Sequence, residues 1–404
     1  MRLPSIVKKA YKKLLKNQFA NSECTPDIDK WDEYLELLGP AMDYVDASYK
    51  KYQCRVFSYS RFARVFMNVT SFFALFAYLP FALKKSKKLS ADPVEGRAFF
   101  EIDAEVGYED IFPAQLRTEY PTIVSGVKDK LYVGELCEPA KEMYLTCKKA
   151  HPFEFEYRLW LIKELARHSK YLLEENPAAT IIYVNERNVA SPLLKKLYED
   201  DGRKLISFMH GDYLFQIVLA YAAFSTYFFW DQFYIDKFTD RERWNCGNYE
   251  VYVPHRLNYA QNEENALEQT IFLTYYCSGE SERSISLLKD IFKKIEEKGL
   301  TCKVRPHPRD SHVDLIMKVF PVEQIELPEQ CTIQESLMQT RYPVGLMPTV
   351  LSEAIAARKE IVIDDITEPA KYNNLLKQDA IIFNKDFVLL SSLLKDLCGY
   401  SSEK

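Results

Sequence analysis

Short apolar runs alternate with amphipathic stretches of helical spacing from about residue 97 to the end of the chain. The clearest runs are ATIIYVNE, KLISFMHGD, TIFLTYYCSG and EIVIDD, and several are rich in β-branched residues. This alternation predicts parallel strands whose two faces are both covered by helices. A chain of 404 residues is long for one domain, so we expect two.

A polar stretch without apolar spacing, NYAQNEENALEQ, divides the alternation into two parts. We therefore expect an α/β fold with two doubly wound, Rossmann-like domains that face a cleft. The expected boundaries are 96–258 for the first domain and 259–404 for the second, after a helical N-terminal region at 1–95. In open sheets of this kind, ligands bind beyond the carboxyl ends of the strands, so the residues directly after each strand are the candidate site.

Charge and cysteine content exclude some classes of function. The net charge is −5, which argues against a nucleic-acid-binding protein, since such proteins are usually basic. The nine cysteines show no zinc-ligand spacing, and their scattered positions favour reduced thiols in a reducing compartment. No pair of acidic residues follows a strand in a way typical of a metal site. We expect neither a metal nor a cofactor.

Two N-terminal segments predict contact with a membrane. Residues 1–20 have the pattern of a basic amphipathic helix and lack the continuous apolar core of a signal peptide; a solvated first helix would fit as well. The segment from Val65 to Leu83 is almost entirely apolar and is flanked by basic residues. Its length is close to the ~20 residues that span a bilayer. A buried or interface-lying helix and a true span both remain open, and both favour a cytoplasmic protein at the inner face of the membrane.

Two strand ends in the second half carry features of an anion site. In KVRPHPRD, Arg305 offers a charged fork of donors, and Pro306 and Pro308 fix His307 between them. A solvated basic loop is the alternative.

The second of these strand ends is GLMPTVLSEA, where Thr349 stands at the expected start of a helix whose exposed N–H groups favour phosphate. Glu353 could accept hydrogen bonds from a ribose diol, or it could be an ordinary acid of the first helical turn. Together, the two loops predict a nucleotide site on one rim of the sheet.

Strand ends in the first half supply candidates for catalysis. His210 precedes Gly211 at the end of an expected strand, where an imidazole could act as a general base for a sugar hydroxyl. Glu186 ends the preceding strand and could orient His210 or be the base itself. Asp231 could bind hydroxyls of the acceptor. The alternatives are a structural histidine in a turn and a simple turn at Asp231.

Three of these motifs resemble those of known families. RPHP resembles the His-Pro motif of bacterial sialyltransferases, and LMPTVLSEAIAARKEIVID resembles the nucleotide-holding element of GT-B glycosyltransferases. FMHGD resembles the HG motif of polyglycerol-phosphate transferases. Over slightly more than its C-terminal half, the chain is thus similar to bacterial GT-B glycosyltransferases of capsule and lipooligosaccharide assembly. The acidic-acidic-Gly motif of the sialyltransferases is matched by letter at 200–202, but its place between a helix and a strand indicates a turn.

The resemblance implies roles for particular residues. It implies donor-phosphate contacts at His307 and Arg305, ribose or phosphate contacts at Thr349, Ser352 and Glu353, and a base at His210. The expected function is metal-independent transfer of a sugar from a CMP- or UDP-linked donor to a glycan acceptor, a cell-surface polysaccharide or lipooligosaccharide. The alternatives are a CDP-polyol phosphotransferase on the same fold and a non-catalytic, membrane-associated scaffold.

Overall fold

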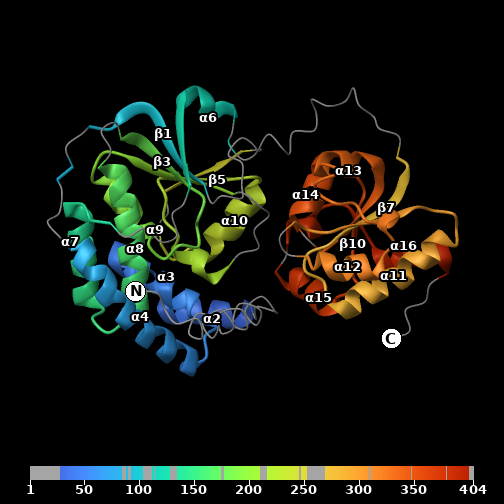
Figure 1. Cartoon of the computed structure of the whole chain (residues 1–404), viewed down its shortest axis with the longest axis horizontal. Helices are drawn as coiled ribbons and strands as arrows, with labels where there is room; N and C mark the ends of the chain where they lie inside the picture. Colours follow the sequence, from blue (N-terminus) through green and yellow to red (C-terminus); the bar gives the residue numbers. More distant parts are fainter. Residues whose placement is uncertain are drawn as a thin grey trace. The chain divides into compact units, whose positions relative to one another are not determined.

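The computed structural model describes most of the chain as two compact units (Figure 1). The first contains the described residues from Asp29 to Tyr252, and the second contains those from residue 269 onward. His210 and most of the predicted linker lie outside the described residues. The described ranges are 28–83, 88–89, 92–102, 112, 114–127, 134–173, 177–209, 216–244, 247–252, 269–308, 311–346, 348–378 and 380–399.

The sheet of the first unit has six parallel strands in the order β2-β1-β3-β4-β5-β6. The chain begins at β1, adds β2 on one side, and then returns to add the other strands on the other side. This order places the topological switch point between β1 and β3. The strands are β1 (Val94–Ile102), β2 (Thr122–Val127), β3 (Ala178–Tyr183), β4 (Lys204–Phe208), β5 (Thr226–Phe229) and β6 (Asn248–Val251).

Helix α8 contacts both α4 and α7. Thirteen residues of α8 are buried, an extent typical of a helix covered on several sides. The described helices are α2 (Ile28–Leu38), α3 (Tyr44–Arg55), α4 (Arg61–Ala82), α6 (Ala114–Glu119), α7 (Glu138–Ala150), α8 (Phe155–Leu172), α9 (Ser191–Glu199), the 3₁₀ helix η1 (Ile217–Tyr221) and α10 (Gln232–Arg241).

Helix α3 ties the N-terminal helical region directly to the first sheet. Its Ser48 hydroxyl donates to the carbonyl of Val189 at 2.8 Å, and the fully buried ammonium of Lys51 donates to the carbonyl of Glu186 at 2.6 Å. Both acceptors lie in the loop after β3. Helices α2 to α4 therefore belong to the same compact unit as the first sheet.

The sheet of the second unit has five parallel strands in the order β11-β10-β9-β7-β8. Strand β7 is the first strand of this sheet, as β1 is of the other, and the switch point lies between β7 and β9. The strands are β7 (Ile271–Tyr276), β8 (Cys302–Arg305), β9 (Thr340–Gly345), β10 (Ile361–Ile363) and β11 (Phe387–Leu389).

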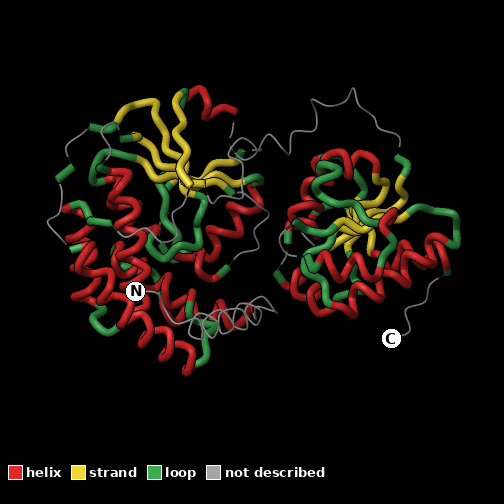
Figure 2. Tube along the Cα trace, in the orientation of Figure 1, coloured by secondary structure: helices red, strands yellow, loops and turns green. Residues whose placement is uncertain are grey.

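Helices surround the strands of this second sheet (Figure 2). Helix α11 contacts α12 and α16, whereas α13 and α14 contact β9. The helical elements are α11 (Glu282–Glu296), α12 (Val313–Val319), η4 (Val322–Gln324), α13 (Ile333–Gln339), α14 (Pro348–Ala356), α15 (Pro369–Lys377), η5 (Ile381–Asn384) and α16 (Leu390–Cys398).

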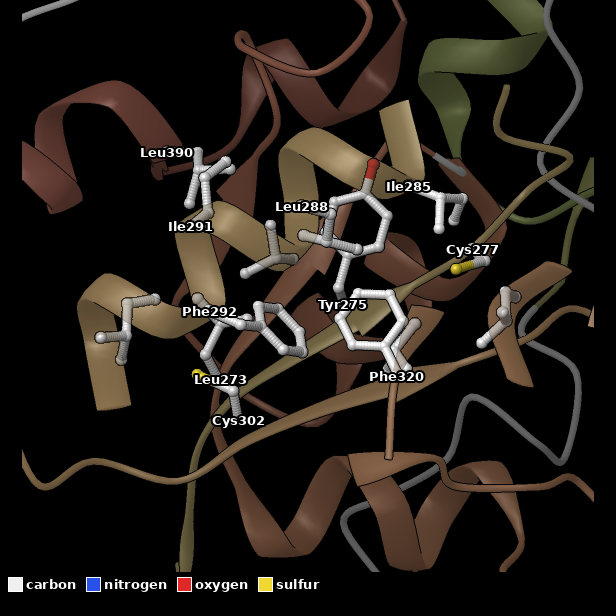
Figure 3. Packing of buried hydrophobic residues seen from close by; sticks show 14 of the residues in the cluster. Leu273, Tyr275, Cys277, Ile285, Leu288, Ile291, Phe292, Cys302, Phe320 and Leu390 are labelled. Atoms are coloured by element: carbon white, nitrogen blue, oxygen red, sulfur yellow. The ribbon is translucent and has the colours of Figure 1, made fainter. Parts of the chain in front are cut away.

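The core of the second unit forms where α11 meets β7 and β8 (Figure 3). The sequence places one apolar face on α11, and all five residues of that face are buried: Ile285, Leu288, Ile291, Phe292 and Ile295. They pack against Leu273 and Tyr275 of β7 and against residues of α12 and α16. Spacing alone thus predicts which side of this helix is buried.

The two strand orders confirm the prediction of two doubly wound α/β domains. Both sheets begin with a central strand and switch sides after the second strand, as in other doubly wound folds. The turn expected at Asp200 to Gly202 is also present, and Gly202 has a φ of +72°. The facing arrangement of the two domains stays a prediction.

We expect the apolar face of α11 to carry much of the stability of the second unit. Replacing Leu288 with alanine should lower the free energy of unfolding by about 2–5 kcal/mol, because the lost methyl groups leave a cavity. Val322 lies in the same unit and is exposed, so Val322→Ala should change stability by less than about 0.5 kcal/mol. Urea unfolding followed by circular dichroism measures both, and equal effects would contradict the packing described.

Candidate functional site

The carboxyl edge of the second sheet is organised by Asp364, which directly follows β10 and is fully buried. Its Oδ1 accepts hydrogen bonds from the backbone N–H groups of Ile366 and Thr367, both at 2.9 Å. Its Oδ2 accepts from the hydroxyl of Tyr275 at 2.6 Å and from the hydroxyl of Thr367. Burial and the charge of Asp364 raise the pKa of Tyr275 far above its ordinary value, so this phenol stays a donor. The loop after β10 is thereby fixed to β7.

The loop after β7 places a carboxylate at the switch point. Cys277, Ser278 and Gly279 lead from the strand to Glu280, and Ser281 caps helix α11 by accepting from the backbone N–H of Ser284 at 3.1 Å. Glu280 Oε1 accepts hydrogen bonds from the backbone N–H and the hydroxyl of Ser278. These bonds fold the Glu280 side chain back over the end of β7.

Glu280 is an unusual group to bury. Its side chain is only 5% exposed, and its Oε2 has no hydrogen-bond partner among the described residues. Burial raises the pKa of this carboxyl, although the Ser278 N–H and the charge of Lys371 act in the opposite direction. A buried acceptor without a partner costs about 1–3 kcal/mol, so it marks a place where an external donor would be favourable.

Two charged side chains from the loop and helix after β10 contact the loop after β7. The ammonium of Lys371 donates to the hydroxyl of Ser278 at 2.7 Å and lies 4.0 Å from Glu368 Oε2. Glu368 Oε1 accepts from the N–H of Ser281 at 3.2 Å and from the hydroxyl of Ser284 at 2.9 Å. The strand ends of β7 and β10 therefore join in one cluster, which we call the edge cluster: Ser278, Glu280, Ser281, Glu368 and Lys371.

The edge cluster offers the complementary groups that a nucleoside phosphate needs. A carboxylate with a spare acceptor can receive hydrogen bonds from ribose hydroxyls, and an ammonium can contact phosphate oxygens. The cluster also stands beside the switch point, where doubly wound sheets bind ligands. Among the residues that the structure describes, no His, Cys, Asp and Glu side chains form a group suited to a metal ion.

The structure places the three predicted residues of the RPHP motif differently from one another. Arg305 is buried at the end of β8, where it forms an ion pair with Glu326 at 2.6 Å and donates to the carbonyl of Cys331 at 2.7 Å. His307 is half-buried, and its backbone N–H donates to the hydroxyl of Ser311 at 2.8 Å. Pro308 is exposed. Both of these partners of Arg305 lie within the protein, and contacts of this motif with a donor phosphate stay a prediction.

The predicted helix after β9 is present as α14, and it carries the other predicted donor contacts. Thr349 and Ser352 are half-buried in it, and Glu353 is buried. Since β9 pairs with both β7 and β10, the start of α14 follows a strand adjacent to those that carry the edge cluster. This topology brings the start of α14, with Thr349, to the same edge of the sheet, whereas Glu353 lies beyond the first turn in which it was expected.

The predicted catalytic residues of the first unit are only partly described. His210 lies outside the described residues. Glu186 follows β3 and is buried, with its Oε1 at 3.9 Å from Nε of Arg187. Asp231 follows β5 and caps α10, because its Oδ1 accepts from the N–H of Phe233 at 2.8 Å. Acceptor binding by Asp231 stays a prediction.

Sequence reasoning points to the residues directly after each strand as a class, but it does not select Glu280, Glu368 or Lys371. A local signal exists for Glu280, which follows a central strand and precedes a helix cap. No local signal joins Glu280 with Lys371, because these residues stand far apart in the sequence. Only the pairing of β7, β9 and β10 brings them together.

Comparisons with known proteins give similarity in structure alone. No family model and no curated protein matches the chain. Among solved structures, the UDP-GlcNAc 2-epimerase of Methanocaldococcus jannaschii, in complex with UDP-GlcNAc and UDP, is 14% identical, with a TM-score of 0.41 over 72% of this chain and 93% of that chain. The glycotransferase of kitacinnamycin is 10% identical, with a TM-score of 0.37 over 72% of this chain and 86% of that chain. Similarities at this level assign no activity.

The raised pKa of Glu280 predicts how stability depends on pH. At pH values above 4.5, the ordinary pKa of a glutamate, the folded protein keeps the Glu280 proton more readily than the unfolded chain does. The free energy of unfolding therefore falls as the pH rises from about 4.5 through the raised pKa of Glu280. Glu280→Gln should therefore gain stability relative to the wild type from acid toward neutral pH, by about 1 kcal/mol at neutrality. Urea unfolding at a series of pH values measures this change.

Glu282 provides the matched control, because it is exposed in the first turn of α11, two residues after Glu280. Glu282→Gln removes the same charge without removing a buried carboxylate. Identical pH profiles for the two variants would show that Glu280 is not a buried acid with a raised pKa.

Proposed function

We propose that this protein is a glycosyltransferase that takes its sugar from a nucleotide-activated donor and binds the nucleotide at the carboxyl edge of the second sheet. The buried Glu280 carboxylate carries the proposal, because its Oε2 has no hydrogen-bond partner among the described residues. It stands at the switch point of a doubly wound sheet, beside the ammonium of Lys371. The motif resemblance to GT-B glycosyltransferases supports the reaction class.

Each group of the edge has a role in the proposed complex. Glu280 Oε2 accepts a hydrogen bond from a ribose hydroxyl, which removes the cost of the unpaired acceptor. Lys371 and the N–H groups at the start of α14 contact the phosphates, and they stabilise the charge that develops on the leaving group. Protein donors can supply this stabilisation without a metal ion. His307 is the further phosphate contact implied by the resemblance.

The finer assignments rest on the resemblance and on positions after strands. In the proposed reaction, His210 removes the proton from the acceptor hydroxyl, and Glu186 orients His210 or serves as the base itself. The donor is a CMP- or UDP-linked sugar, and the acceptor is a cell-surface polysaccharide or lipooligosaccharide. Thr349, Ser352 and Glu353 of α14 add ribose or phosphate contacts.

We expect nucleotide binding to depend on the edge cluster. Calorimetric titration with CMP, CDP, UDP and GDP should find one preferred nucleotide. Lys371→Ala and Glu280→Gln should each weaken that binding by about tenfold or more, because each removes a hydrogen bond that involves a charged group. If Glu280→Gln loses affinity while it gains the expected stability, damage to the fold cannot explain the loss, and a binding role for Glu280 does.

Lys377 offers the control for Lys371, because it lies on the same helix α15 and is exposed. Lys377→Ala should leave the affinity unchanged. Undiminished binding in both Lys371→Ala and Glu280→Gln would overturn the proposed nucleotide site. Failure of the wild-type protein to bind any of the four nucleotides would favour a non-catalytic scaffold.

We expect His210→Ala to lose turnover by about 10²–10⁴-fold while nucleotide affinity stays near the wild-type value, because a general base acts on the reaction step. Donor consumption and product mass measure turnover. Unchanged turnover would remove His210 from the mechanism and leave Glu186 as the base to test. Phosphorus transferred into the acceptor would identify a polyol-phosphate transferase in place of a glycosyltransferase.

A further inference from the structure

Helix α4 has two different faces. The face that contacts α8 contains buried Ala63, Met67, Ser71 and Leu75. The opposite face carries five large apolar side chains that are between 51% and 73% exposed. We call these five residues the α4 stripe: Phe62, Val65, Val69, Phe73 and Phe76. Their spacings of three and four residues place them in one line along the helix.

A second segment extends this apolar surface. Phe153, just before α8, is 77% exposed, and its carbonyl accepts a hydrogen bond from the side-chain amide of Asn68 at 2.8 Å. The ring of Phe72 on α4 packs edge-on against that of Phe155, with 4.9 Å between the ring centroids. Exposed apolar residues from two elements gathered in this way are typical of a surface that meets another apolar phase.

Two polar residues of α4, Asn68 and Thr70, form hydrogen bonds within the protein. The hydroxyl of Thr70 donates to the carbonyls of Phe66 and Met67, both at 3.0 Å. The Asn68 amide oxygen accepts from the N–H of Glu156 at 3.1 Å, in addition to the bond that Asn68 donates to Phe153. Because these groups already have protein partners, contact with hydrocarbon would leave neither of them without a hydrogen bond.

Charge around the α4 stripe has the sign opposite to that of the whole chain. From residue 56 to residue 91 the sequence contains six Lys and Arg residues and no Asp or Glu, although the chain as a whole carries −5. Of these basic residues, Arg61 and Arg64 at the start of α4 and Lys88 beyond its end are described and exposed. Basic groups that flank an apolar face are attracted to anionic lipid headgroups.

We propose that the α4 stripe lies in the headgroup region of an anionic bilayer and holds the protein on that surface. By length and composition, α4 is the described helix that could cross a membrane. However, its buried face packs on α8 along the helix, so only the outer face is available to lipid. The helix therefore lies parallel to the membrane, with its aromatic side chains at the boundary between headgroups and acyl chains.

Binding of the full-length protein to vesicles tests this proposal. The wild type should bind vesicles of phosphatidylcholine mixed with phosphatidylglycerol, bind pure phosphatidylcholine less, and be released by high salt. Replacing Phe73 and Phe76 together with serine should lower partition to the mixed vesicles by about tenfold or more, because the bilayer no longer buries these two aromatic side chains. Both side chains are exposed in the fold, and equal unfolding midpoints would confirm that the variant stays folded.

Val322→Ser serves as the control, because it removes an exposed apolar side chain from the second unit. It should bind vesicles as the wild type does. The proposal is overturned if the wild type binds no vesicles or if the double variant binds like the wild type. Retention on the vesicles after high salt and alkaline carbonate would indicate a span and overturn the parallel placement. A wild-type dimer that the double variant dissociates, without vesicle binding, would identify the stripe as a contact between copies.

Discussion

Four hydrogen bonds to one buried carboxylate hold the carboxyl edge of the second sheet in shape. Asp364 receives two backbone N–H groups from the loop after β10, and two hydroxyls, one of them from β7. Because two strands and a loop are joined at this point, Lys371 and Glu368 are held close to the end of β7. With all four bonds made, Asp364 is a satisfied buried charge. Glu280 in the loop after β7 is not satisfied, because its Oε2 has no hydrogen-bond partner among the described residues, and this contrast is the reason we propose a ligand-binding role for Glu280 alone.

Arg305 and Lys371 are basic residues beyond the ends of two strands, and their side chains have different surroundings. Arg305 has the stronger local signal, since it lies in a basic loop stiffened by two prolines. The structure nevertheless pairs its guanidinium with Glu326 in the interior and directs a second donor to a backbone carbonyl. Lys371 stands in an ordinary amphipathic helix, and its ammonium reaches the switch point. Sequence position alone does not distinguish them, because the distinction depends on which acceptor lies opposite.

Elements of the fold follow from local spacing, whereas the site depends on pairing between distant strands. The apolar face of α11, the turn at Gly202 and the strands on either side of α9 could all be predicted from residues within a few positions of one another. Strand order could not, since any of several orders fits the same alternation. The partnership of Glu280 and Lys371 depends on that order, because β9 and β10 must lie on one particular side of β7. The positions after strands were thus predictable as a class, while the members that meet were not.

The strand order of the first unit also means that β1 must pair with a strand far along the chain. Strand β1 pairs with β3 so that Ala98 stands beside Thr180, and helices α7 and α8 intervene between them. Closing so long a loop costs conformational entropy before the contacts between β1 and β3 can form. Parallel sheets of this kind are therefore slow to form. As the ribosome releases the chain, β1 has its β3 edge open until α8 and then β3 have emerged. During that interval the unpaired backbone groups on this edge of β1 are exposed to pairing with other chains.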